Sequence, residues 1–295
     1  MQSLWIIVST FFTAASYALI KGLNENWTFF EIFFVRMFFI LIVTLALAFA
    51  SGTSLKTQYP IPYATRTVCG ILALCLNIVV VQHLPLGTAQ TLIFTTPIFV
   101  ACWTIIHKTL ERLPISVEAI LSVLLGFTGI LFVLRPTVEG SLFYALLALI
   151  SAFSSAVVSI TLKELGKMKE PILRSVFYFA LGGVLLAWAT CFFYSDKTFS
   201  VLLSEPVLLA VGFTSAASQL AQAQGWGKGK TFLCANLQFT AVIFAFVFGF
   251  LFFQENLDVL TGIGILIIVF SEFWTAKLQL NKQFTSFFLR TNRPT

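Results

Sequence analysis

Arg36 is the residue of this sequence whose position best suits ligand-binding chemistry. It lies about eight residues into an apolar run over 28–50, roughly 12 Å along a helix. Inside a bilayer a charge costs at least about 2.5 kcal/mol, so the guanidinium is expected to face protein or water. There it could bind a carboxylate with two parallel hydrogen bonds. The alternative is that Arg36 reaches the outer headgroups or ties two helices together.

Uncharged polar side chains accompany Arg36 deep inside the apolar runs. Buried amides need hydrogen-bond partners, and within a membrane they either join helices or line a wet cavity. The side chains that we expect to line a substrate cavity are Arg36, Tyr17, Asn77, Thr96, Gln219 and Gln238. Pro97 is predicted to be a hinge, because its missing N–H frees a carbonyl near the midpoint of its helix. With Arg36 as the one fixed cation, the expected ligand is anionic or zwitterionic.

Acidic residues are predicted only near helix ends. Glu31 is expected at the outer interface, and Glu272 about one turn from the inner end of the last helix. No carboxylate lies at a predicted helix centre. The sequence therefore argues against the hypothesis of a proton antiporter driven by a carboxylate. Facilitated diffusion and exchange against a second metabolite stay open.

The composition predicts an integral membrane protein. The chain has 295 residues, of which 58% are hydrophobic and 10% charged, and its mean hydropathy is +0.94. Soluble domains are about 25% charged. The sequence thus excludes large aqueous domains, nucleic-acid binding and a disulfide scaffold, and it contains no metal-type spacing of Cys or His and no cofactor motif.

Apolar windows bounded by charges or turn residues predict an all-α fold of ten transmembrane helices. The windows are 3–21, 28–50, 62–82, 86–107, 114–135, 141–162, 173–194, 204–223, 231–253 and 258–277. Strands are excluded because open sheet edges are not tolerated in lipid.

Basic residues predict the orientation, since cytoplasmic loops carry more Lys and Arg. With a cytoplasmic N-terminus, 14 of the 18 basic residues face the cytoplasm: Lys56, Arg66, Lys108, Arg112, Lys163, Lys167, Lys169, Arg174, Lys228, Lys230, Lys277, Lys282, Arg290 and Arg293. Lys21, Arg135 and Lys197 would lie outside. We therefore expect a multi-pass protein of the cell inner (plasma) membrane with both termini in the cytoplasm.

A short internal repeat suggests a duplication. The matching positions, 144 residues apart, are Thr96 and Thr240, Ala101 and Ala245, Glu111 and Glu255, and Leu113 and Leu257. Since five helices is an odd number, the second copy would be inverted. We expect two inverted five-helix repeats over 1–138 and 139–278, followed by a basic cytoplasmic tail over 279–295. Inverted repeats build carriers with a site at the repeat interface.

The order of several motifs resembles the drug/metabolite transporter superfamily, specifically its ten-helix EamA-type members. The motifs are Phe30-Glu31-Ile32-Phe33-Phe34-Val35-Arg36-Met37-Phe38, Leu84-Pro85-Leu86-Gly87-Thr88-Ala89, Thr95-Thr96-Pro97-Ile98-Phe99, Leu110-Glu111-Arg112-Leu113 and Phe252-Phe253-Gln254-Glu255. The resemblance covers about residues 3–277. It implies a membrane carrier that exports or exchanges amino acids or related small metabolites. Ala241 departs from the pattern, because the second repeat often has Pro there.

Several functions stay open on the sequence alone. The leading interpretation is a secondary carrier that works by alternating access, with a small-molecule substrate, the lipid bilayer, and a coupling proton or exchanged metabolite as its partners. A nucleoside-like metabolite such as S-adenosylmethionine is the alternative substrate. A membrane-embedded enzyme would need acid, base or metal groups clustered at one depth, which the sequence does not show. A structural or receptor-type subunit would not need the polar core or the repeat.

Overall fold

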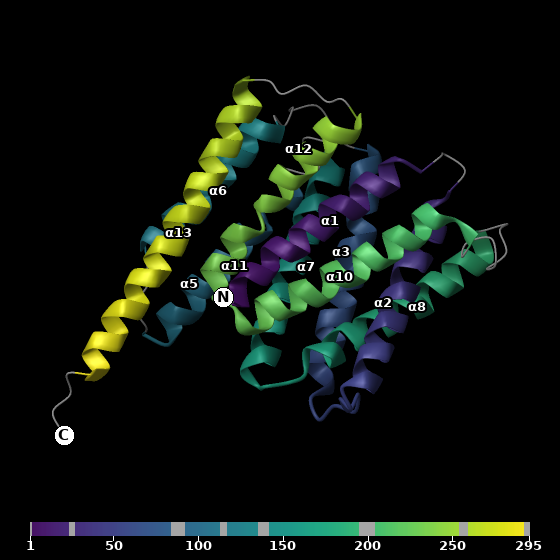
Figure 1. Cartoon of the computed structure of the whole chain (residues 1–295), viewed down its shortest axis with the longest axis horizontal. Helices are drawn as coiled ribbons and strands as arrows, with labels where there is room; N and C mark the ends of the chain where they lie inside the picture. The colour runs from purple at the N-terminus through teal and green to yellow at the C-terminus, as the bar shows by residue number, and fades with distance from the viewer. Residues whose placement is uncertain are drawn as a thin grey trace.

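The helices of the computed structural model occur where the apolar windows predict them. The structure describes residues 2–23, 27–83, 92–112, 117–134, 142–194, 204–253 and 259–291. Within these ranges every regular element is a helix (Figure 1). The elements are η1 (Gln2–Leu4), α1 (Trp5–Lys21), α2 (Phe29–Ala50), α3 (Pro60–His83), α5 (Thr96–Leu110), α6 (Val117–Leu134), α7 (Leu142–Lys167), α8 (Ile172–Tyr194), α10 (Pro206–Lys228), α11 (Thr231–Leu237), α12 (Thr240–Phe253) and α13 (Val259–Thr291).

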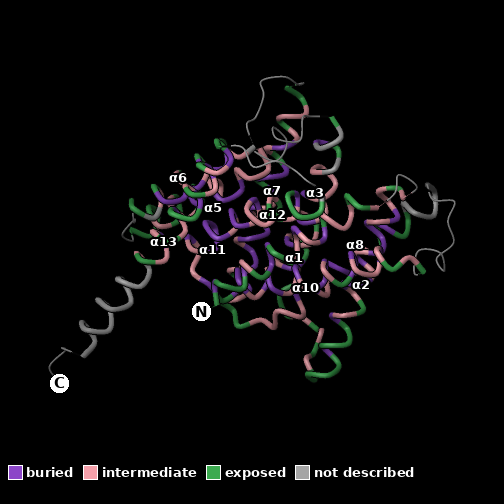
Figure 2. The backbone as a smooth tube through the Cα atoms, turned by 45° about the horizontal axis from the view of Figure 1, so that its top comes forward, coloured by how far each residue is buried: buried purple, intermediate pink, exposed green. Residues whose placement is uncertain are grey.

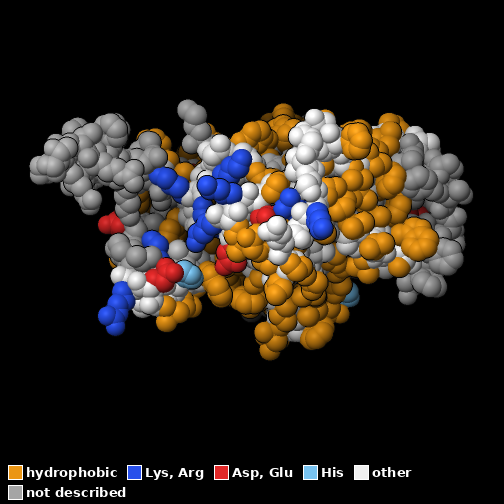
Figure 3. Space-filling model, turned by 90° about the horizontal axis from the view of Figure 1, so that it is seen from below, with side chains coloured by type: hydrophobic (Ala, Val, Ile, Leu, Met, Phe, Trp, Pro, Cys, Tyr) orange, Lys and Arg blue, Asp and Glu red, His pale blue; other side chains and the backbone are white. Residues whose placement is uncertain are grey.

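Six helical segments of the described ranges are long and apolar enough to cross a membrane. They are Gln2–Lys21, Phe29–Ala50, Leu142–Lys167, Ile172–Ala189, Thr231–Phe252 and Val259–Leu278. Large hydrophobic side chains on these segments are exposed, among them Phe49 at 93% and Phe273 at 70%. In Figure 3 hydrophobic side chains cover much of the visible surface, whereas basic side chains gather toward its middle and left. An apolar exterior of this kind is suited to lipid.

Two helix ends show how local chemistry sets the boundaries. The Thr28 N–H donates to Glu31 Oε2 at 2.8 Å, which satisfies a donor at the start of α2. Glu31 is only 1% exposed and acts as a helix cap, consistent with its predicted place at a helix end. Pro206 occupies the first turn of α10, where its missing N–H costs no hydrogen bond.

The predicted end of the last helix at 277 is wrong. α13 continues to Thr291, although its membrane-compatible part ends at Leu278. The loss of hydrophobicity after this point ends the apolar window but does not end the helix, since Lys, Gln and Leu are good helix formers. Glu272 consequently lies in the interior of α13 rather than one turn from its end.

The helices pack in pairs that recur in the two parts of the chain. α6 and α13 lie together at one end of the bundle and α2 and α8 at the other (Figures 1 and 2). Between them, α1 packs on α10 and α12, and correspondingly α7 packs on α3 and α5. The contact of α2 with α10 is matched by that of α8 with α3. Buried positions line the faces that meet in the middle (Figure 2).

Glycine permits the closest approach of two backbones, between α7 and α10. A Cβ at Gly166 would overlap the Gly227 carbonyl group, so that only glycine fits there. Beside this contact, Lys163 Nζ donates to the Gly229 carbonyl oxygen. The two helices, which come from different halves of the sequence, are therefore locked together at one end.

Candidate functional site

A row of hydroxyl groups lies between α1 and α10. We name Ser9, Thr13, Ser16, Ser215 and Ser218 the α1–α10 seam. Ser218 Oγ hydrogen-bonds with Thr13 Oγ1 at 2.6 Å and with Ser9 Oγ at 3.2 Å. Ser16 Oγ lies 3.1 Å from Ser215 Oγ. The three α1 residues recur at helical spacing, so the seam is a polar stripe inside an apolar bundle.

Arg36 joins this seam from α2. Its Nε donates to Ser215 Oγ at 2.9 Å, and its guanidinium carbon lies 5.6 Å from the centre of the Tyr17 ring. The side chain is partly buried, and Tyr17 is 50% exposed. The guanidinium thus contacts α10 through Ser215 and α1 through Tyr17. No carboxylate of the described residues forms an ion pair with it.

Arg66, on α3, is a buried cation that the sequence did not predict at the site. It was counted among the cytoplasmic charges, yet it is 1% exposed. Its Nη2 donates to Gln219 Oε1 at 3.0 Å, and its guanidinium carbon lies 3.8 Å from the centre of the Phe179 ring. The expectation of Arg36 as the one fixed cation is therefore wrong. The available signal was the window 62–82, which already placed Arg66 inside a helix.

Gln219 and Asn77 lie in different parts of the polar interior. Gln219 is held by Arg66, close to the seam. The Asn77 Oδ1 atom accepts a hydrogen bond from Ser151 Oγ at 2.6 Å, which joins α3 to α7. The structure brings Arg36, Tyr17 and Gln219 together around α10, whereas Asn77 lies at the contact of α3 with α7.

Two helix discontinuities occur 144 residues apart. The turn at 94–95 precedes α5, and the turn at 238–239, which includes Gln238, separates α11 from α12. The helices that follow begin at Thr96 and Thr240. Thr96 Oγ1 donates to the Ile93 carbonyl at 2.8 Å, and Thr240 Oγ1 donates to the Leu237 carbonyl at 2.6 Å. In each case the interruption leaves a carbonyl without a backbone N–H donor, and a threonine hydroxyl donates a hydrogen bond to it instead.

Pro97 lies in the first turn of α5, directly after the turn at 94–95, and the Ile93 carbonyl that its missing N–H leaves free accepts from the Thr96 hydroxyl. The expected uninterrupted helix around Pro97 is therefore wrong, whereas its role as a hinge stays a prediction. The window 86–107 carries no charged residue, and the absence of charge alone does not show where a helix is interrupted. Residues 84–91 lie outside the described residues.

The first helix of each half contacts one of these discontinuities. Thr10 Oγ1 of α1 hydrogen-bonds with Thr240 Oγ1 at 2.7 Å. Correspondingly, Thr96 Oγ1 donates to the Ala152 carbonyl of α7 at 3.2 Å. In many membrane carriers, interrupted helices at equivalent positions of two halves form the substrate site.

A family model for EamA-like transporters matches this chain twice, over residues 1–135 and 142–276. The chain belongs to the EamA-like transporter family. Membership makes it a membrane transporter and not an enzyme, which confirms the resemblance drawn from the sequence.

Curated relatives of this EamA-like chain are also transporters. The pseudopaline exporter CntI of Pseudomonas aeruginosa (strain UCBPP-PA14) is 27% identical over 265 residues, which cover 89% of this chain and 91% of the relative. An uncharacterized transporter of Bacillus subtilis (strain 168), YvbV, is 24% identical over 243 residues, or 79% of this chain and 76% of the relative. A solved crystal structure shares the fold, with a TM-score of 0.76 over 94% of this chain and 96% of that chain at 14% identity.

A second polar cluster of the EamA-like fold joins α11 to α6 and α13. Asn236 Nδ2 donates to the Ser271 carbonyl at 2.8 Å, and Thr275 Oγ1 hydrogen-bonds with Ser122 Oγ at 2.7 Å. These polar groups supply one another's hydrogen-bond partners, which is typical of polar residues that join packed helices. Next to them in sequence, Glu272 has one carboxyl oxygen that is buried without a hydrogen-bond partner.

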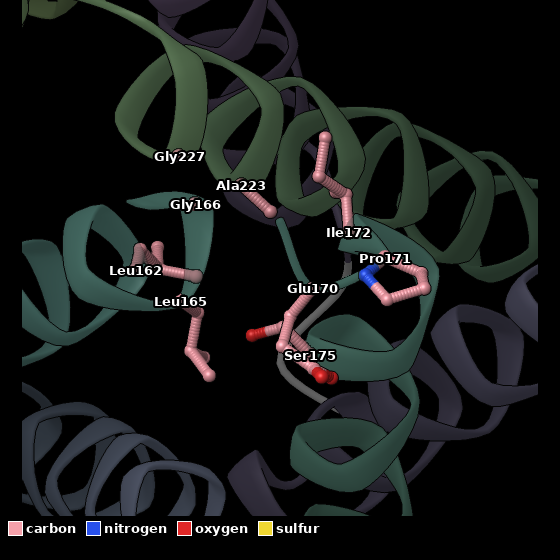
Figure 4. A pocket seen from close by; sticks show the side chains of 9 residues that line it. All are labelled: Leu162, Leu165, Gly166, Glu170, Pro171, Ile172, Ser175, Ala223 and Gly227. Carbon is pink, nitrogen blue, oxygen red and sulfur yellow. The ribbon is translucent and has the colours of Figure 1, made fainter. Parts of the chain in front are cut away.

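The four serines of the seam, Ser9, Ser16, Ser215 and Ser218, are each at most 7% exposed. An apolar crevice of about 10 Å³ lies between α7, α8 and α10 and includes Leu162, Ile172 and Ala223 in its lining (Figure 4). This volume holds about one water molecule. A wider open groove of about 270 Å³ is lined by residues of 45–55. Neither of these two spaces is lined by Arg36 or Arg66.

Proposed function

We propose that this chain exports or exchanges a small amino-acid-like metabolite that carries a carboxylate, and that it does so by alternating access. The observation that carries the proposal is the Arg36 guanidinium, which is hydrogen-bonded to Ser215 in a polar seam without a carboxylate partner among the described residues. A fixed cation at such a place is costly unless it meets an anion, and a substrate carboxylate supplies one.

We propose that two inverted five-helix repeats, over 1–138 and 139–278, form the carrier. In this arrangement α11 and α12 are the two parts of one interrupted span, which gives ten spans in total. The equivalent discontinuities, the corresponding helix contacts and the double match to the family model support it. The substrate site then lies where the two repeats meet, around the seam.

Both termini are proposed to lie on the cytoplasmic side of the cell membrane. Cysteines placed at the exposed residues Lys21 and Lys167 should then react with a membrane-impermeant maleimide from opposite sides. The experiment needs a background without native cysteines. Modification of both positions from the same side of sealed cells would refute the orientation.

The substrate class is tested by counterflow in proteoliposomes. Labelled alanine, leucine and glutamate should exchange against an unlabelled internal pool, whereas amines that lack the carboxylate and uridine should not. The expected difference is about tenfold or more, since a hydrogen bond to a charged group contributes about 1.5–3 kcal/mol. Exchange of uridine without exchange of any amino acid would support the nucleoside-like alternative instead.

The energy source is proposed to be a gradient, because the sequence contains no nucleotide-binding motif in a suitable context. Glu272 is the carboxyl that would bind a coupling proton, since one of its oxygens is buried without a partner. Transport that follows an imposed pH gradient in the native protein, and loses this dependence in Glu272→Gln, indicates proton coupling. Transport that ignores the gradient indicates exchange of two metabolites.

A further inference from the structure

Arg66 has hydrogen-bonding capacity that the protein does not use. Its Nε and Nη1 atoms are buried and have no hydrogen-bond partner. No carboxylate of the described residues forms an ion pair with this guanidinium. An arginine stays protonated in proteins, so a positive charge and two nitrogens that together carry three N–H donors are buried inside the bundle without an acceptor. Such a group is costly unless a ligand completes it in another conformation.

The surroundings of Arg66 hold its guanidinium in place, and glycine at position 70 keeps a side chain away from it. The Phe179 ring covers one side, with 3.8 Å between its centre and the guanidinium carbon. Gln219 holds Nη2. On α3 itself, a Cβ at Gly70 would lie 3.3 Å from Nη1 and 2.9 Å from the Phe179 ring. Any side chain at position 70 would therefore crowd the free donor.

The partly buried Arg36 and the buried Arg66 contact the same face of α10. Arg36 contacts Ser215, and Arg66 contacts Gln219, one helical turn later. Residues four apart lie on one helix face, with about 6 Å between them along the axis. Because α10 runs over Pro206–Lys228, these two residues lie at equal distances from its ends and bracket its midpoint. A membrane carrier binds its substrate at this depth.

We propose that Arg66 is a second anion-binding group, and that Arg36 and Arg66 together take a metabolite with two anionic groups, such as an amino-acid-like dicarboxylate. The inference rests on the proposed function, in which Arg36 binds one carboxylate. Arg66 adds a second point of attachment one helical turn along α10. A substrate with a single carboxylate would leave one buried guanidinium without a counter-charge.

The test compares dicarboxylates with monocarboxylates of equal chain length. The full chain in lipid nanodiscs is titrated with glutarate and adipate and with pentanoate and hexanoate, and binding is followed by thermal stabilisation and calorimetry. The native protein should bind the dicarboxylates about tenfold more tightly or better, a difference of about 1.4 kcal/mol. Equal affinity for the two series would overturn the inference.

Substitutions at Arg66 separate ligand binding from a structural role. Arg66→Gln should lose the preference for dicarboxylates while keeping its affinity for monocarboxylates, and Arg66→Lys should keep part of the preference because it keeps the charge. Lys167→Gln removes an exposed charge and should behave like the native protein. Loss of both affinities in a folded Arg66→Gln protein would show that Arg66 shapes the site instead, which contradicts the inference.

The two proposals fail in distinguishable ways. Counterflow of amino acids without a preference for dicarboxylates overturns the role of Arg66 and leaves the proposed function standing. Absence of both binding and counterflow for every carboxylate tested overturns the proposed function and, with it, the role of Arg66.

Discussion

Arg36→Gln should reduce counterflow of carboxylate substrates by about tenfold to a hundredfold while the protein still inserts and folds. The substitution removes the charge that meets the substrate carboxylate, and charge-assisted hydrogen bonds contribute about 1.5–3 kcal/mol. Glutamine keeps an N–H group that can still reach Ser215, so that the contact of α2 with α10 is retained. The measurement is initial counterflow rate in proteoliposomes at matched protein content.

Lys167→Gln is the matched control for Arg36→Gln, because it removes one positive charge from an exposed position outside the seam. It should leave the rate unchanged. If Arg36→Gln transports at the native rate, Arg36 is a structural residue that joins α2 to α10, and the proposed carboxylate site is refuted.

Gly166→Ala should destabilise the protein by about 3 kcal/mol or more. The added Cβ would overlap the Gly227 carbonyl, and neither helix backbone can move aside without separating α7 from α10. The neighbouring hydrogen bond from Lys163 to the Gly229 carbonyl would be lost with this separation. Thermal unfolding in detergent should show a clear fall in melting temperature.

Gly262→Ala provides the comparison within the same protein. Like Gly166, Gly262 lies in a terminal turn of its helix, here the first turn of α13, yet a Cβ there would meet no atom within 4 Å. Alanine favours a helix over glycine by about 1 kcal/mol, so this variant should be as stable as the native chain or more stable. Equal melting temperatures for both variants would show that α7 and α10 are not in close contact.

The helices were predictable because their signals are local. Apolar length, turn residues and proline at a first turn depend on neighbours in sequence, and α2 begins within one residue of its predicted window. The interruption between α11 and α12 was not predictable in this way, since 231–253 is apolar on both sides of Gln238. The repeat gave the only pointer, through the match of Thr96 with Thr240.

The site was only partly predictable because its contacts join distant segments. Arg36 could be singled out from its depth in an apolar run, but its partner Ser215 lies 179 residues away. Arg66 follows a polar segment near a helix start, a position at which charges usually mark the interface. Its burial depends on Phe179 and Gln219, which lie in other helices. The amide of Gln219 predicted that this residue lines the substrate cavity, but nothing in the sequence indicated that it accepts a hydrogen bond from Arg66.

Accessibility of position 215 from the two sides of the membrane tests the central claim most directly. In a background without native cysteines, Ser215→Cys should react with a membrane-impermeant, sulfonate-bearing thiol reagent applied from either side, although Ser215 is only 2% exposed in this structure. A transported carboxylate should slow both reactions. A thiol that stays unreactive from both sides, in a protein that still transports, would contradict a substrate path through the α1–α10 seam.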